Sequence, residues 1–107
     1  MKAKRSPKKL KSWSDLKKGR FQKNPDEAIA YLKASLEENG DMPEIVIEAI
    51  REVSESLGLS IEQIAKKAHK TPSTIHKALG KSGNPTLGTL TAVLKTMGLR
   101  LSVERTS

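Results

Sequence analysis

The sequence contains no cysteine and only three aromatic residues. Without cysteine the chain has no disulfide framework, no thiol nucleophile and no thiolate ligand for zinc or an iron–sulfur cluster. It also lacks a long apolar run, since the roughly 20 apolar residues needed to span a bilayer occur nowhere. No apolar stretch follows the basic N-terminus, as one would in a secretory signal peptide. We therefore expect a cytoplasmic protein without a membrane segment.

Residues with metal-binding or catalytic spacing are scarce as well. His69 and His76 are the only histidines, and no carboxylate lies between them to complete a set of metal ligands. No serine is placed with a histidine and an acid, and no glycine-rich phosphate loop or paired-carboxylate motif stands out. We expect no metal, no cofactor and no enzymatic activity.

What the chain has in excess is positive charge, and this charge is segregated. The 107 residues include 20 Lys and Arg against 12 Asp and Glu, for a net charge of +8. Residues 1–23 hold ten basic residues and one acid, residues 24–57 two basic residues and nine acids, and residues 58–107 eight basic residues and two acids. The basic segments favour binding to a polyphosphate, because neutralised phosphates release counterions. The same nucleic acid would repel the acidic middle, which is expected to face away from it or to face a basic protein.

A chain of this length makes one domain, and its composition divides it into three segments. Residues 1–23 have too few apolar side chains to offset the entropy of ordering, so we expect a basic, partly disordered N-terminal arm. Residues 24–98 carry apolar residues at helical spacing and predict a helical domain. Residues 99–107 are expected to form a C-terminal strand and tail.

Capping signals divide the helical domain into five helices. Asn24, Ser60, Thr71 and Thr86 each stand where a side chain can cap a first turn, and Ser60 with Gln63 makes a capping box. The fold class is therefore all-α, a five-helix bundle. The expected helices lie within residues 24–40, 42–58, 60–68, 71–80 and 86–98.

Beyond residue 98 the apolar spacing changes from helical to strictly alternating. Leu99, Leu101 and Val103 would share one face of a short β-strand. The sequence offers no second strand, and an unpaired edge exposes backbone donors and acceptors. We expect this strand to pair outside its own protomer, with the same strand of a second copy or with a sheet of another protein. A tail packed on the helices is the remaining alternative.

The third and fourth expected helices have the spacing of a helix-turn-helix, because only a tight turn fits between them. On the fourth helix, Ser73, His76 and Lys77 point away from the apolar face. Hydroxyls near its first turn lie where backbone N–H groups and the helix dipole favour phosphate. Flanking lysines can contact the DNA backbone. The candidate DNA-binding residues are Lys70, Thr71, Ser73, Thr74, His76, Lys77 and Lys81, with Lys66 and Lys67 as further phosphate contacts.

Several motifs between residues 20 and 104 resemble known families. The runs similar to the Xre/Cro-type helix-turn-helix are Gly58-Leu59-Ser60, Gln63 through Ala68, Thr71 through Ile75, and Gly83-Asn84-Pro85-Thr86-Leu87. The runs that resemble HigA-like addiction-module antidotes (antitoxins) are Asn24 through Ala28, His76 through Gly80, Leu90 through Leu94, and Gly98 through Val103. Ile61 and His69 depart from the Xre pattern, which often has Gln and Gly at these positions.

The resemblance implies the antitoxin of a type II toxin–antitoxin module. Such a protein binds and neutralises a small basic RelE/ParE-like toxin, and as a homodimer it represses its own operon on a palindromic, double-stranded operator. The acidic segment would then face the toxin. The candidate toxin-binding residues are Glu37, Glu38, Glu44, Glu48 and Glu52, within a wider set that includes Glu27, Asp41 and Glu55.

Two other functions stay open at this point. A stand-alone Xre-family transcriptional regulator without a toxin partner shares every feature of the DNA side, and a neighbouring gene for a small basic protein would distinguish the two. The basic arm also suits an RNA-binding or ribosome-associated protein, in which removal of residues 1–19 would abolish binding.

Overall fold

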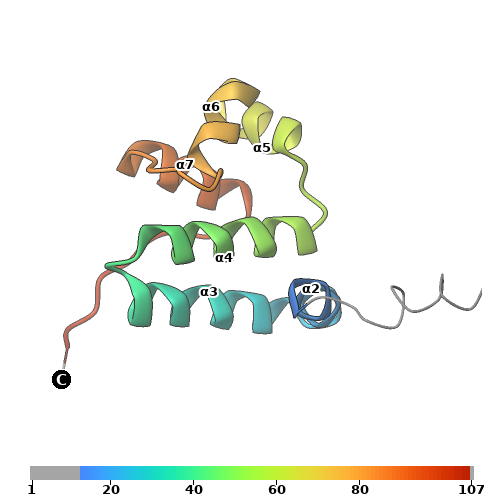
Figure 1. Ribbon diagram of the computed structural model, residues 1–107, viewed down its shortest axis with the longest axis vertical. Helices are drawn as coiled ribbons and strands as arrows, with labels where there is room; N and C mark the ends of the chain where they lie inside the picture. The colour runs from blue at the N-terminus through green and yellow to red at the C-terminus, as the bar shows by residue number, and fades with distance from the viewer. Residues whose placement is uncertain (1–12, 107) are drawn as a thin grey trace, which may run out of the picture.

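The computed structural model describes residues 13–106, which form six α-helices and no β-strand. The helices α3 and α4 run side by side, α2 lies at the N-terminal end of α3, and α5, α6 and α7 cover the opposite side of α4 (Figure 1). Helix α4 is therefore the layer between the other helices. The six elements are α2 (Trp13–Lys23), α3 (Pro25–Asn39), α4 (Pro43–Ser56), α5 (Ile61–Ala68), α6 (Pro72–Ala78) and α7 (Leu87–Thr96).

All five helices expected in the helical domain are present and begin at the predicted caps. The Ser60 hydroxyl accepts from the backbone N–H of Gln63 at 3.1 Å, and the Gln63 side chain accepts from the backbone N–H of Ser60 at 2.9 Å, which completes the capping box. Thr71 and Thr86 each accept from the backbone N–H three residues further on, at 3.2 Å. Asn24 occupies the N-cap position of α3, but its side chain makes no capping hydrogen bond.

Helix α2 corrects the expected count of five helices. Its residues belong to the segment expected as a partly disordered arm, of which residues 1–12 lie outside the described part of the chain. Only 5% of Phe21 is exposed, and its ring centroid lies 5.1 Å from that of Tyr31 on α3. Helix α2 is held in place by one buried aromatic side chain and by several ion pairs with the acidic segment. Its low apolar content alone does not predict an ordered helix.

The expected C-terminal strand is the second correction. Residues 99–106, here called the C-terminal segment, have no regular secondary structure, because one protomer offers no neighbouring strand for a hydrogen-bonded ladder. Leu99 and Leu101 are half-buried against the helical core, whereas Val103 is 97% exposed. The three side chains therefore do not share one environment, and only the first two pack on the helices.

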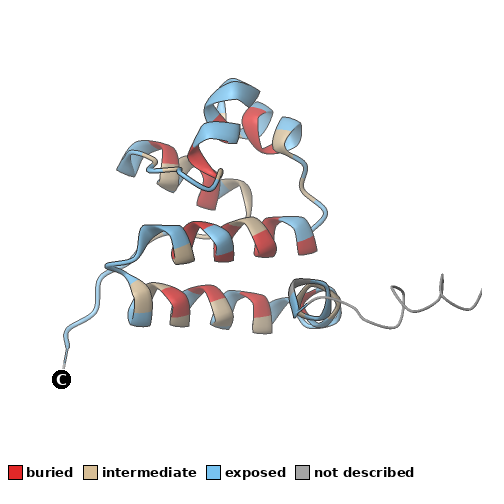
Figure 2. Ribbon diagram, in the orientation of Figure 1, coloured by how far each residue is buried: buried red, intermediate tan, exposed pale blue. Residues whose placement is uncertain are grey.

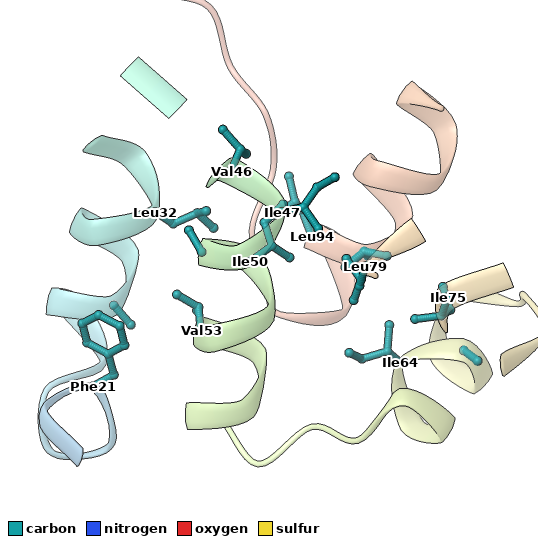
Figure 3. Close-up of a cluster of buried hydrophobic side chains, with 14 residues drawn as sticks. Phe21, Leu32, Val46, Ile47, Ile50, Val53, Ile64, Ile75, Leu79 and Leu94 are labelled. Carbon is teal, nitrogen blue, oxygen red and sulfur yellow. The ribbon is translucent and has the colours of Figure 1, made fainter. Parts of the chain in front are cut away.

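The core is built around α4, along which buried positions recur (Figure 2). Phe21 and Leu32 pack on one side of α4, and Leu79 and Leu94 pack on the other (Figure 3). Ile50 of α4 belongs to the same continuous cluster and is almost completely buried. Since each such side chain contributes about 1.5–3 kcal/mol on burial, α4 fixes the α2–α3 layer and the α5–α7 layer relative to each other.

A polar cluster ties α2 to α3 and α4. The Lys17 ammonium donates to the Tyr31 hydroxyl at 3.0 Å and to a Glu52 carboxylate oxygen at 3.1 Å, and Tyr31 donates to the same oxygen at 2.9 Å. Burial raises the pKa of the Tyr31 hydroxyl. Burial also opposes the charge on Lys17, but its hydrogen bonds to Tyr31 and Glu52 outweigh this and raise its pKa. The three groups thus satisfy one another's hydrogen-bonding needs in a partly buried site.

Replacement of Glu52 by Ala should lower the free energy of unfolding by about 2 kcal/mol. The change leaves the Lys17 ammonium without its counter-charge and the Tyr31 hydroxyl without its acceptor. Glu48→Ala, on an exposed position of the same helix, should change stability by no more than about 0.5 kcal/mol. Urea denaturation of both variants at pH 7 measures the difference. Equal midpoints for the two variants would show that the cluster contributes nothing to the docking of α2.

Candidate nucleic-acid and protein interfaces

Helices α5 and α6 pack against each other and are joined by residues 69–71. His69 adopts the left-handed conformation (φ 57°, ψ 41°) that usually favours Gly or Asn. The backbone N–H of Lys70 then donates to the carbonyl of Ala65 at 2.9 Å, which closes the end of α5. The position where the Xre pattern often has Gly thus keeps the backbone shape that Gly would give. We call these two helices and their turn the α5–α6 unit.

Helix α6 divides into a buried and an exposed face as its sequence predicts. Ile75, Ala78 and Leu79 are buried, and Ile75 and Leu79 join the main core. The predicted DNA-binding residues all lie at exposed positions on α6 or beside it: Lys70, Thr71, Ser73, Thr74, His76, Lys77 and Lys81. They therefore all face solvent, on or beside one short helix.

The surface of the α5–α6 unit is strongly basic. Its one acidic residue is Glu62, and within residues 13–106 none of its lysines forms an ion pair. Unpaired lysines beside exposed hydroxyls are the groups that contact phosphate oxygens in protein–DNA complexes. Thr71 has a structural task as well, because its hydroxyl caps α6 and lies 2.9 Å from the hydroxyl of Thr74. The exposed lysines of the unit and the following loop are Lys66, Lys67, Lys70, Lys77 and Lys81.

The loop that follows α6 passes directly against the end of that helix. The backbone N–H of Gly83 donates to the carbonyl of Gly80 at 2.9 Å, and a Cβ atom at Gly83 would overlap with the carbonyl of Ala78. Glycine is therefore required for this close approach. A shallow open groove results between the loop and α6, and its lining includes Thr74, His76, Lys77, Ser82, Asn84 and Pro85.

Three of the predicted acidic contacts form ion pairs with the chain's own basic helix α2. Glu52 is a correction to the predicted toxin-binding set, because its side chain is only 5% exposed and its carboxylate is occupied in the polar cluster. Glu27 pairs with Arg20 at 2.7 Å, and Glu55 pairs with Lys18 at 3.2 Å. The amphipathic pattern of α4 predicts that Glu52 is exposed to solvent, but in the folded chain α2 covers this position.

The other five predicted acidic contacts, four glutamates and Asp41, stay exposed. Glu37 and Glu38 lie at the end of α3, and Glu44 and Glu48 lie in the first two turns of α4. Because α3 leads directly into α4, these carboxylates gather where the two helices are connected, at the opposite end of α3 from α2 (Figure 1). Within the described residues none of the four has an ion-pair partner. We call this group of four glutamates the acidic end.

The C-terminal segment, α3 and Leu94 of α7 together line a groove of mixed polar and apolar character. Lys33 of α3 holds the segment through an ion pair of 3.3 Å with Glu104. Val103 is outside the lining and faces solvent. The apolar side chains that line the groove are Ile29, Leu32, Leu36, Leu94, Leu99 and Leu101.

Arg51 makes a contact that sequence reasoning missed. Its Nη1 donates to the backbone carbonyl of Leu79, at the end of α6, at 2.6 Å. The sequence offers one signal for such a contact: Arg51 and Lys33 are the only basic residues among residues 24–57. Each of the two makes a contact between elements that are distant in sequence.

Residues 13–106 contain neither a cluster of metal ligands nor a membrane-spanning helix. No group of three or more His, Cys, Asp or Glu side chains is arranged to hold a metal ion. None of the helices in this part of the chain has the length and apolar content to cross a membrane.

Comparison with known proteins gives two matches. A family model described as "Probable addiction module antidote protein" matches residues 15–105, from α2 into the C-terminal segment. An uncharacterized protein of Haemophilus influenzae is 31% identical over 80 residues, which are 75% of this chain and 78% of that relative. No solved structure matches the chain significantly.

Proposed function

The chain belongs to the family of probable addiction module antidote proteins, and from this premise we propose that it is a type II antitoxin that also represses its own operon. The observation that carries the proposal is the basic, hydroxyl-rich surface around α6, which is separate from the acidic end. Two charged surfaces of opposite sign suit two different partners, a nucleic acid and a basic protein.

For DNA binding, we propose that the α5–α6 unit is a helix-turn-helix and that α6 is its recognition helix. A helix with polar side chains on one face fits the major groove of B-DNA, where lysine can read guanine. The lysines beside it would neutralise phosphates and fix the register. Since one short helix contacts only a few base pairs, a dimer would place two copies of α6 about 34 Å apart on a palindromic operator.

For toxin binding, we propose that the acidic end contacts a small basic toxin of the RelE/ParE type. The four glutamates of this group are exposed, and the described residues supply them with no cation. A basic partner would therefore find negative charge that is not already neutralised within the protein, which favours both encounter and correct orientation.

For dimerisation, we propose that the C-terminal segment pairs with the same segment of a second copy. It lacks regular secondary structure in the protomer, and Val103 projects into solvent. An antiparallel ribbon across a twofold axis would satisfy the backbone groups and cover this side chain.

The toxin proposal predicts a specific partner and a specific surface. If only this protein is tagged and it is co-expressed with the product of the adjacent gene, a small basic protein should co-purify in stoichiometric amount and should arrest growth when expressed alone. The double variant Glu44→Lys, Glu48→Lys should weaken binding of that partner about tenfold or more, because two attractions become repulsions. Affinity is measured by calorimetry, and neutralisation by growth of co-expressing cells.

The matched control is Glu62→Lys, which reverses an exposed glutamate on α5 instead of α4. It should leave partner affinity unchanged. An equal loss of partner affinity in Glu62→Lys would show that the effect comes from net charge alone. Unchanged neutralisation by the double variant would exclude the acidic end as the toxin-binding surface. A lone dimer that shifts its own promoter DNA would favour the stand-alone regulator instead.

The DNA proposal predicts that Lys77→Ala weakens operator binding by about 1–3 kcal/mol, because a base-reading contact is lost. Fluorescence anisotropy with operator and scrambled duplexes at one salt concentration measures the effect. Lys23→Ala removes the same charge from the end of α2, far from α6, and should reduce binding much less. Equal losses on operator and scrambled DNA would make Lys77 a phosphate contact, and no loss would exclude α6 as the recognition helix.

The dimer proposal predicts that Val103→Glu raises the dimer dissociation constant about tenfold or more, because a twofold ribbon brings the two new carboxylates close together. Val103→Thr keeps the branched shape and should dimerise nearly as well as the wild type. Sedimentation velocity over a range of concentrations measures the dissociation constant. The thermal stability of the protomer should not change, since Val103 is exposed; a monomeric wild type would contradict the proposal.

A further inference from the structure

Arg51 connects α4 to the C-terminal end of α6. Its half-buried guanidinium donates at 2.6 Å to the carbonyl of Leu79, the residue that caps the end of α6. Leu79 itself is 2% exposed and belongs to the core. A cation at this position combines a charge-assisted hydrogen bond with a favourable interaction with the negative end of the helix dipole. The contact therefore stabilises α6 where the helix stops.

Helix α6 is too short to hold its direction unaided. It contains seven residues, and isolated helices of this length are unstable in water. Its first turn is held by the Thr71 cap, and Ile75 anchors its middle in the core. Beyond Leu79 the chain continues as a loop, so no further helical turn supports that end. Arg51 supplies the polar contact from another element at this position.

The contact acts on the face of α6 that is turned away from solvent. Leu79 lies on the buried side of the helix, whereas Ser73, His76 and Lys77 are exposed. Loss of the Arg51 hydrogen bond would therefore alter how α6 is held without removing any group from the basic surface. An effect of Arg51 on DNA binding would pass through the orientation of α6.

We propose that Arg51 is a positioning residue for DNA binding, which sets the orientation of α6 from α4. The inference rests on the proposed DNA-binding function, but it concerns a residue outside the predicted recognition surface. It assigns a role to a basic side chain within an otherwise acidic helix, where pairing with a neighbouring glutamate would be the ordinary expectation.

The test compares Arg51→Met with Arg51→Lys in the full chain. Methionine keeps much of the apolar stem but donates no hydrogen bond, whereas lysine keeps the charge and can donate hydrogen bonds from a different head group. We expect operator binding by Arg51→Met to weaken about tenfold, and Arg51→Lys to recover part of this loss. Amide hydrogen exchange should quicken within α6 in Arg51→Met, while the amides of α3 keep their wild-type rates. Lys23→Met removes the same charge from α2; it should leave hydrogen exchange in α6 unchanged and should weaken operator binding much less than Arg51→Met.

The outcomes separate the inference from the proposed function. If the wild type binds no operator, the proposed function fails, and hydrogen exchange alone decides whether Arg51 holds α6. Wild-type exchange rates in α6 of Arg51→Met would overturn the inference. Faster exchange in every helix would also overturn it, because the contact would then support the whole fold instead of one helix. Unchanged operator affinity in Arg51→Met, with a wild type that binds, would exclude a role in DNA binding.

Discussion

Burial of α4 on two opposite sides is the constraint on which the other elements depend. Phe21 and Leu32 cover one side and Leu79 and Leu94 the other, so that a single apolar cluster runs through the molecule. The charged side chains of α4 have distinct environments. Glu52 is enclosed by α2 and α3, Arg51 reaches α6, and Glu44 and Glu48 stay in solvent. One helix thus joins the basic surface and the acidic end.

The distribution of charge in the folded chain differs from its distribution in the sequence. Basic side chains of α2 meet acidic side chains of α3 and α4, as in the pairs Lys17–Glu52 and Arg20–Glu27. These pairs neutralise part of both segments within the protein. Among the exposed charges that form no ion pair within residues 13–106 are the lysines around α6 and the four glutamates of the acidic end. The net charge of +8 therefore understates how strongly the two surfaces differ, and electrostatic steering depends on such local fields more than on the total.

The sequence predicted the helices of residues 24–98 because their signals are local. A cap such as Ser60 with Gln63 acts over three residues, and the two faces of α6 follow from helical periodicity. The docking of α2 could not be predicted in this way, because it depends on Tyr31 and Glu52, which are distant in sequence. For the same reason the burial of Glu52 was missed. Local information was enough to predict that the candidate DNA-binding residues are exposed. The environment of the acidic residues depends instead on how α2, α3 and α4 pack together.

In the proposed dimer, the C-terminal segment would form a strand that the protomer lacks. Leu99 and Leu101 anchor its first part on the core, and the ion pair between Lys33 and Glu104 holds its later part beside α3. A segment that is already held loses less conformational entropy when it pairs, so a partner strand adds backbone hydrogen bonds at a reduced ordering cost. Val103 lies between these two attachments, and its apolar side chain is almost fully exposed, so its burial by a partner would be favourable. In the proposed dimer, pairing with the second chain would supply the strand that the alternation of Leu99, Leu101 and Val103 predicts.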